Sequence, residues 1–325
     1  MACCEKTQKP QNSNVSVRIE HRHILFNTLQ GGGSGFFVKP DKVVTNIHAI
    51  VERKSILITS VDRERAWKVE GVVAYDLEND LAILKVTDKG IPLLLSNSDV
   101  LQKDEPISIF GFPYGKFKVT EGFVYGFQES EKWFKIKPNL SDGYSGSPVL
   151  NEKRHVIGVI VSSLVSRDNR ELHSVAISLN ALKALLDRVE EPAEPLRKWR
   201  RRKLIRSFAK LLKGKQNFWN RRYRKAITDF NRAIQLNPKL SEAYWFRAEA
   251  KVELDDREGA IIDYNNAIQL GPEDASLYND RGCTKSELGD LEGAIKDYDS
   301  AIQLNPENTR FYENRGRTKS GLGDF

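Results

Sequence analysis

The pattern of hydrophobic residues is typical of strands in the first part of the chain and of helices in the second. Up to about residue 190, short runs rich in β-branched and aromatic residues alternate with turn residues, which is typical of a β-barrel or β-sandwich. The runs are GFFV (35–38), SILITS (55–60), VEGVVAY (69–75), LAILKV (81–86), ISIFGF (107–112), FVYGF (123–127), WFKIK (133–137), HVIGVIVSS (155–163) and VAIS (175–178). After them, Leu179, Leu182, Leu185 and Leu186 have helical spacing, so we predict a helix over 179–191.

Beyond residue 195 the pattern is helical and it repeats. The strings NRAIQLNP (231–238), NNAIQLGP (265–272) and DSAIQLNP (299–306) follow one another at intervals of 34 residues. Small residues recur at the same interval, where two helices approach most closely: Gly214, Ala248, Gly282 and Gly316. The period, the small residues and the closing proline resemble the tetratricopeptide repeat (TPR), which implies an all-α solenoid. Repeats are predicted at 207–240, 241–274 and 275–308, with a partial fourth from Thr309.

Charge marks a boundary between the two halves. Residues 195–228 carry 14 basic and no acidic side chains, whereas 229–325 carry 12 basic and 19 acidic ones. The preceding EEPAEP (190–195) is typical of a linker, because two prolines interrupt a packed element. We therefore predict a flexible N-terminus over 1–14, a β domain over 15–190, a basic linker or helix over 191–206 and repeats over 207–325.

Composition narrows the classes of protein. In 325 residues no apolar run approaches the roughly 18 residues that span a bilayer. The first twenty residues contain no apolar signal region. The three cysteines, Cys3, Cys4 and Cys283, are too few and too unevenly placed for a disulfide framework or a four-cysteine zinc site. We predict a cytoplasmic protein that needs neither metal nor cofactor.

Three segments of the β domain carry chemistry: GGGSGFFVKPDKVVTNIHAI (31–50), YDLENDLAILKV (75–86) and SDGYSGSPVLN (141–151). Together they resemble the His, Asp and Ser segments of the chymotrypsin-like serine peptidases, closest to the HtrA (Do-like) branch. The resemblance implies a trypsin-like double β-barrel with His48 as base, Asp80 as its partner and Ser145 as nucleophile. It also implies an oxyanion hole made by the backbone N–H groups of Gly143 and Ser145.

These residue types suit the chemistry, because a serine hydroxyl needs a base within hydrogen-bond reach to attack at neutral pH. Each assignment has rivals. Of His21, His23, His48, His155 and His173, only His48 lies in a T-N-x-H context. Asp76 competes with Asp80, but only Asp80 precedes Leu-Ala-x-Leu. Ser141 and Ser147 flank Ser145, which alone lies in G-x-S-G.

Substrate preference is weakly encoded. Asn139 falls where trypsins keep the aspartate that binds Lys or Arg, so a trypsin-like preference is not supported. By the same resemblance, Ser163 and His173 lie in segments that wall the S1 pocket. A histidine in that wall would favour an acidic or amide P1 side chain, but the favoured interpretation is that His173 is a partly exposed rim residue. Tyr144 stands where secreted trypsins carry the Asp that pairs with a new N-terminus, so activation by cleavage is not expected.

The sequence of the C-terminal half predicts that this part of the chain binds another protein. The groove positions of the first repeats are apolar and then acidic: Phe208, Leu211, Lys215, Phe218, Trp219, Glu242, Trp245, Glu249, Val252 and Glu253. Leu204, Ile205, Phe208, Leu211 and Leu212 give the basic stretch one apolar helical face. That stretch, 195–225, can contact nucleic acid or anionic membrane, but a solvated connector is the favoured interpretation.

The sequence thus predicts an intracellular serine endopeptidase whose repeats recruit a protein substrate or regulator. The rival interpretation is a catalytically silent protease fold that acts as a scaffold. Residues 309–325 keep the internal repeat consensus and stop at LGDF. Natural terminal helices of solenoids usually carry a polar outer face. We therefore expect the natural reading frame to continue with further repeats.

Overall fold

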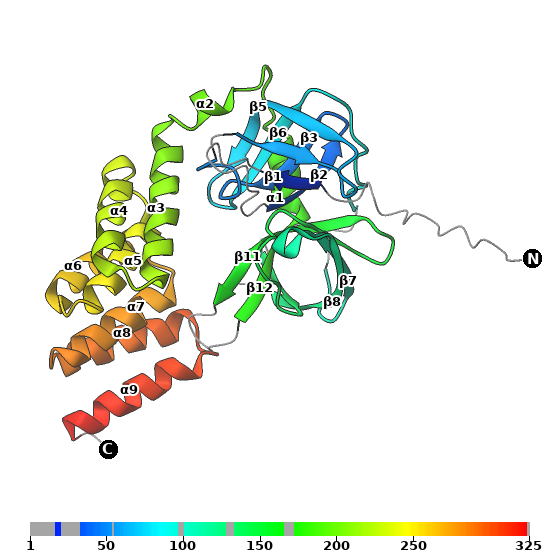
Figure 1. Ribbon diagram of the computed structural model, residues 1–325. Coiled ribbons are helices and arrows are strands. Elements are labelled where there is room, and N and C mark those ends of the chain that lie inside the picture. Colours follow the sequence, from blue (N-terminus) through cyan, green and yellow to red (C-terminus); the bar gives the residue numbers. More distant parts are fainter. Residues whose placement is uncertain are drawn as a thin grey trace, which may run out of the picture. The chain divides into compact units, whose positions relative to one another are not determined.

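The computed structural model describes residues 17–20, 33–53, 55–96, 101–127, 133–165 and 172–323 (Figure 1). The predicted flexible N-terminus, residues 1–14, lies outside the described residues. The chain forms two compact units, and the boundary between them falls between Arg200 and Arg201. We call them the barrel unit, up to Arg200, and the repeat unit, from Arg201, and describe each by itself.

The barrel unit begins with a closed antiparallel barrel in the strand order β1-β2-β3-β6-β5-β4 (Figure 1). Its strands are β1 (Val17–Glu20), β2 (Gly33–Lys39), β3 (Lys42–Asn46), β4 (Leu57–Thr59), β5 (Ala66–Asp76) and β6 (Leu81–Val86). Every residue of β3 and all but one of β6 are buried. The apolar run LAIL (81–84) of β6 fits this position, whereas β3 also buries the polar residues Lys42, Thr45 and Asn46.

A second closed barrel follows in the order β10-β11-β12-β9-β8-β7. Its strands are β7 (Pro106–Gly111), β8 (Lys118–Phe127), β9 (Trp133–Lys137), β10 (Pro148–Leu150), β11 (Val156–Val165) and β12 (Leu172–Ser178). A short 3-10 turn, Pro113–Gly115, separates β7 from β8. The predicted double β-barrel is confirmed. The sequence pattern missed β1, β3 and β10, because runs of three to five residues carry little period-two signal.

Helix α1 (Leu179–Leu186) joins the two barrels into one core. Its buried residues Leu179, Leu182 and Leu185 pack in the same hydrophobic cluster as Phe36 of β2 and Phe110 of β7. The helix ends at Leu186, before the predicted limit of 191. The chain beyond it turns to the backbone of β5, where the N–H of Glu190 donates to Val73 O at 2.8 Å.

The repeat unit consists of paired helices. They are α3 (Lys203–Trp219), α4 (Tyr223–Leu236), α5 (Ser241–Val252), α6 (Arg257–Leu270), α7 (Ala275–Glu287), α8 (Leu291–Leu304) and α9 (Thr309–Leu322). The predicted α-solenoid of TPR repeats is confirmed, with α9 starting at Thr309. A Cβ on Gly214 would lie 2.3 Å from the Phe230 ring, and one on Gly282 2.8 Å from the Tyr298 ring. The helices of these pairs therefore approach too closely for a side chain.

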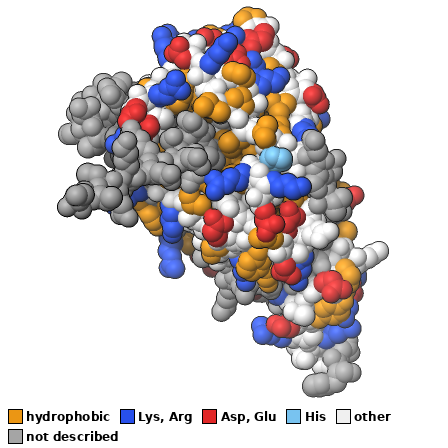
Figure 2. Space-filling model, turned by 90° about the vertical axis from the view of Figure 1, so that its right-hand side faces the viewer, with side chains coloured by type: hydrophobic (Ala, Val, Ile, Leu, Met, Phe, Trp, Pro, Cys, Tyr) orange, Lys and Arg blue, Asp and Glu red, His pale blue; other side chains and the backbone are white. Residues whose placement is uncertain are grey.

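The basic stretch differs in part from its predicted apolar face. Ile205 and Leu211 are buried, but Leu204 is 46% exposed. Ser207 takes the buried place near it and donates its hydroxyl to Ala233 O at 2.8 Å. Among the described residues no helix has the length and apolarity needed to cross a membrane. On the face shown in Figure 2, Lys and Arg side chains lie interspersed with Asp and Glu.

Candidate active site

Strand pairing brings His48 against Asp80. β3 and β6 pair with Asn46 opposite Leu81, so the turns that follow β3 and precede β6 lie side by side. Asn46 Nδ2 and the N–H of Ile47 both donate to Asp80 O at 3.0 Å. The N–H of His48 donates to Asp80 Oδ1 at 3.0 Å, and its ring Nδ1 is hydrogen-bonded to Asp80 Oδ2. Both carboxylate oxygens of Asp80 therefore orient His48.

Burial and backbone geometry single out Asp80. Its φ is +52°, a left-handed conformation in which Asp is tolerated better than most residues, and Asp80 is buried. The His48 side chain is 28% exposed, so its far edge stays open to a substrate. Within the described residues, the carboxylate hydrogen-bonded to His48 is thus that of Asp80 and not that of the rival Asp76.

Asp76 has a different partner set, which fastens the β5–β6 turn. Its carboxylate accepts from the N–H groups of Glu78 and Asn79 at 3.0 and 3.2 Å and from Asn79 Nδ2 at 3.0 Å. Arg188 Nη2 is 3.0 Å from the same carboxylate. Burial raises the pKa of Asp76, but the bonds from Asn79 and Arg188 outweigh it and hold the pKa below 3.8.

Ser145 lies on a turn between two glycines that no other residue can replace. Gly143 has φ +101°, and a Cβ there would lie 2.4 Å from Phe112 O. Gly146 has φ +85°, and a Cβ there would lie 2.1 Å from Ser34 O. No described group accepts a hydrogen bond from the backbone N–H of Gly143 or Ser145. Two unengaged donors on one tight turn are the arrangement that an oxyanion needs.

Ser34 of β2 ties this turn to the first barrel, and the sequence pattern did not identify it. Its hydroxyl donates to Gly143 O at 2.7 Å and accepts from the N–H of Phe112 at 3.2 Å. Its own N–H donates to Ser145 O at 2.8 Å. Ser34 is fully buried. The GSG string (33–35) could have identified Ser34, because a serine at the start of a buried strand needs a hydrogen-bond partner.

Tyr144 is anchored in the second barrel. Its hydroxyl is 2.5 Å from Thr120 Oγ1, and its ring packs on Gly111, where a Cβ would lie 2.5 Å away. Ser147, one of the two serines that flank Ser145, is fully buried. Among the described residues its hydroxyl has no hydrogen-bond partner.

The predicted pocket residues come from three strands or loops of the second barrel. Asn139 is exposed in the loop after β9. Ser163 and His173 lie on the neighbouring strands β11 and β12, opposite Ser174 and Leu164 respectively. Ser174, which the sequence did not single out, is buried and accepts from the N–H of Leu140 at 2.7 Å. It fixes the loop that leads into the Ser145 turn.

The repeat unit contains one recurrent polar site. Asp229, Asp263 and Asp297 are buried at intervals of 34 residues, and each is paired with cations of the preceding helix. Asp263 pairs with Arg247 and Lys251, and Asp297 pairs with Arg281 and Lys285 in the same way. Lys210 lies 2.8 Å from Asp229. These residues stabilise each repeat, and the 34-residue recurrence of Asp was the signal for them.

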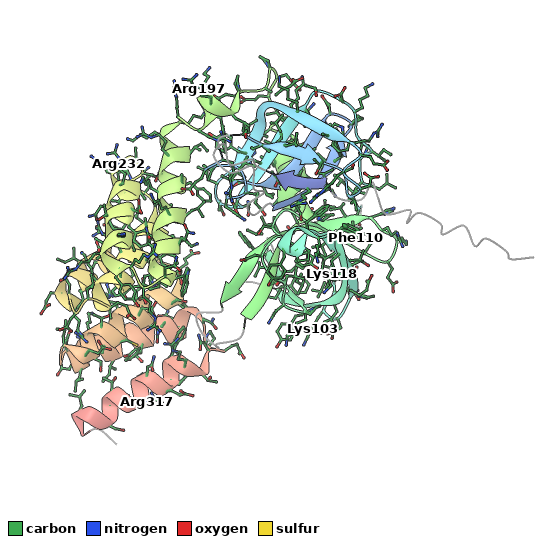
Figure 3. The ribbon with its side chains drawn as sticks, in the orientation of Figure 1. Lys103, Phe110, Lys118, Arg197, Arg232 and Arg317 are labelled. Carbon is green, nitrogen blue, oxygen red and sulfur yellow. The ribbon has the colours of Figure 1, made fainter. Side chains whose placement is uncertain are left out.

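The predicted groove positions of the first repeats include aromatic side chains. Trp219 is 61% exposed and packs edge-on against Phe218 and Phe246. Lys215 lies over the Phe246 ring and 2.8 Å from Glu242. Arg197 of the basic stretch lies on α2 (Leu196–Trp199) of the barrel unit, and Arg232, which comes after that stretch, lies on α4 of the repeat unit (Figure 3).

Comparisons with known proteins agree with this arrangement. A family model for the trypsin-like peptidase domain matches residues 33–159, and two TPR models match residues 218–275 and 286–323. The "Probable periplasmic serine endoprotease DegP-like" of Ectopseudomonas mendocina (strain ymp) is 32% identical over 140 residues, covering 40% of this chain and 29% of the relative. "Protease Do-like 5, chloroplastic" of Arabidopsis thaliana is 26% identical over 178 residues, covering 48% of this chain and 54% of the relative.

The crystal structure of the serine endoprotease from Yersinia pestis aligns over 54% of this chain and 62% of its own, with a TM-score of 0.47 and 20% identity. The fold and the family models together define a trypsin-like peptidase domain. This domain is related to the HtrA/DegP proteases, and TPR repeats follow it in the chain. The chain spans less than two thirds of the length of the curated relatives compared here.

Proposed function

We propose that this protein is a serine endopeptidase that cleaves protein substrates with His48, Asp80 and Ser145. The observation that carries the proposal is the pair of hydrogen bonds between His48 and the Asp80 carboxylate. The backbone N–H of His48 donates to Oδ1, and the ring Nδ1 is hydrogen-bonded to Oδ2. A carboxylate on Nδ1 selects the tautomer whose Nε2 is a base and stabilises the imidazolium that forms. If this pair only stabilised the fold, the His48 side chain would not need to be partly exposed.

The reaction follows from these roles. Ser145 Oγ attacks the scissile carbonyl while His48 Nε2 takes the hydroxyl proton, and Asp80 stays ionised. The carbonyl oxygen gains negative charge and accepts hydrogen bonds from the N–H groups of Gly143 and Ser145. His48 then gives its proton to the leaving amine, and water releases the acyl group by the same steps in reverse order.

The repeats take a protein partner, which is either a substrate or a regulator. The support is the match to TPR models and the exposed aromatic Trp219 at the groove position of the first repeat. For the location of the activity we retain the cytoplasm as a proposal, consistent with the low cysteine content. Fractionation of the natural host cells tests the location directly.

A fluorophosphonate probe tests the activity, because it reacts with a serine only when a base activates it. We expect the wild-type protein to be labelled and to hydrolyse unfolded protein, whereas Ser145→Ala and His48→Ala lose both properties. Ser147→Ala is the matched control: it removes a nearby hydroxyl that has no partner among the described residues, and labelling should persist. A folded wild-type protein without labelling would instead support the scaffold interpretation.

A further inference from the structure

The segment that joins the two units is bonded into the first barrel, beside the candidate catalytic residues. We call residues 188–200 the strap. Val72 of β5 and Glu194 of the strap exchange two backbone hydrogen bonds, each 2.8 Å long. A Cβ on Gly71 would lie 2.2 Å from Glu194 O, so β5 carries a glycine where the strap crosses it. A flexible linker would not need backbone hydrogen bonds to the barrel, so this pairing fixes the position of the strap on β5.

Side chains fasten both ends of the strap. Glu191 pairs with Lys85 at 2.9 Å and with Lys42 at 3.1 Å, on β6 and β3. Near the other end, Trp199 is fully buried and its ring packs edge-on against Tyr75 at a centroid distance of 5.8 Å. A fully buried tryptophan is a large apolar anchor, so this end of the strap is packed into the barrel unit.

The last residue of the strap reaches the turn that carries His48. Arg200 Nη2 donates to Ile50 O at 3.0 Å. The residues 47–51 form a tight turn in which the N–H groups of Ile50 and Val51 both donate to Ile47 O, at 3.0 and 2.9 Å. Burial lowers the pKa of Arg200 from its usual value, in keeping with a guanidinium taken out of water to bind a carbonyl.

The first residue of the strap reaches the turn that carries Asp80. Arg188 binds the Asp76 carboxylate, which itself binds the N–H groups of Glu78 and Asn79 in the turn before Asp80. Asp80 and His48 belong to different turns, and the strap has a contact to each. One segment more than 100 residues later in the chain therefore contacts both turns.

We propose that the strap is a positioning element of the candidate active site, with Arg200 holding the His48 turn and Arg188 holding the Asp80 turn. The catalytic part of this inference rests on the proposed peptidase function. Because the repeat unit starts at Arg201, the repeats are attached directly to the residue that holds the His48 turn. A partner bound by the repeats would thereby have a covalent path to the catalytic base.

The test uses the full chain with Arg200→Ala, and with Arg197→Ala as matched control. Arg197 is an exposed arginine of the short helix α2, and Arg200 is the C-cap residue of that helix (Figure 3). For Arg200→Ala we expect kcat of peptide hydrolysis to fall about tenfold while KM stays within twofold, because a displaced base weakens the transition state and not substrate binding. Arg200→Lys, which keeps one charged donor, should recover part of kcat. Arg188→Ala should have a smaller effect, since its side chain is 57% exposed.

A second measurement is independent of activity. Hydrogen exchange of the Ile50 and Val51 amides should accelerate about tenfold in Arg200→Ala and stay at the wild-type rate in Arg197→Ala. Unchanged exchange, an unchanged kcat, or an equal loss of kcat in Arg197→Ala would overturn the inference. A wild-type protein without hydrolysis or probe labelling would overturn the proposed function instead, and the exchange rates would still decide whether Arg200 holds the turn.

Discussion

The barrel unit and the repeat unit use similar polar contacts over very different sequence separations. In the barrel unit, Ser34 binds Gly143 across 109 residues and Arg200 binds Ile50 across 150. In the repeat unit, Arg247 binds Asp263 across 16 residues, and Arg281 binds Asp297 across the same 16. A contact of the first kind occurs once, whereas a contact of the second kind is copied from repeat to repeat.

This difference teaches how the two units should respond to mutation. Each long-range bond of the barrel unit fixes a unique geometry, so its loss should affect the candidate active site and stability together. Each bond of the repeat unit stabilises one repeat and its neighbours, as expected of a solenoid. Equivalent positions in other repeats therefore supply controls within the same molecule.

The largest effect is expected for Ser34→Ala. The change leaves Gly143 O and the Phe112 N–H without their hydroxyl partner in a buried place. We expect a loss of about 2–4 kcal/mol in the free energy of unfolding and a roughly hundredfold fall in kcat through displacement of the Ser145 turn. Urea unfolding and steady-state kinetics measure the two.

Thr59→Val is the control for that change. The Thr59 hydroxyl is also buried in the first barrel, but it has no hydrogen-bond partner among the described residues. Its removal should leave stability and kcat close to wild type, because no partner is abandoned. Equal effects of the two substitutions would mean that burial, and not the bond to Gly143, makes Ser34 important.

The next effect concerns buried charge in the repeat unit. The Asp263 side chain is 1% exposed and is bound by Arg247 and Lys251. Asp263→Ala leaves these cations without their counter-charge and should cost about 3 kcal/mol. The Asp299 side chain, which is ion-paired with Arg315, is 52% exposed. Asp299→Ala should therefore lower the free energy of unfolding by less than about 1 kcal/mol. Similar losses, measured by urea unfolding at 222 nm, would contradict the distinction.

Two glycines occupy the same position in different repeats, and their substitution by Ala should change the free energy of unfolding in opposite directions. Gly214→Ala forces a methyl group against Phe230 and should destabilise the protein by about 1–3 kcal/mol. A Cβ on Gly316 meets nothing within 4 Å, so Gly316→Ala should stabilise α9 by up to about 1 kcal/mol through helix propensity. Thermal unfolding of the two variants decides; two changes of the same sign would refute the packing argument.

The smallest effect is a dependence of strap stability on pH. Hydrogen bonds from Lys85 and Lys42 hold the pKa of Glu191 below 4.5, and the pKa of Asp76 lies below 3.8. Both groups bind fewer protons in the folded state, so their stabilisation is complete above these values and is lost as pH falls through the folded pKa. The free energy of unfolding of Asp76→Asn should therefore fall less than that of wild type between pH 5 and about 3. Parallel curves would show that Asp76 does not contribute.

Much of the fold was predictable because it is written in local periods. The 34-residue recurrence predicted the solenoid and the starts of α5, α7 and α9, since each repeat buries the same positions. The first repeat was predicted from 207, whereas α3 begins at Lys203. The apolar runs gave most strands of both barrels. Strands β1, β3 and β10 were missed because their pairing and not their composition makes them strands. The end of α1 was misplaced because bonds to β5 redirect the chain.

The sequence by itself determined which residues are chemically able to act: a histidine, an aspartate and a serine in three motifs, with glycines at 143 and 146 beside the serine. It left Asp76 as a rival and assigned no part to Ser34, Ser174 or Arg200. Only the tertiary structure decided those, by placing Asp80 on His48, Asp76 on its own turn, and Arg200 on Ile50. The physical reason is that local periodicity reports burial and backbone conformation within one element. The partner of a hydrogen bond that closes a loop of more than 100 residues is fixed only when the barrels and the strap have packed.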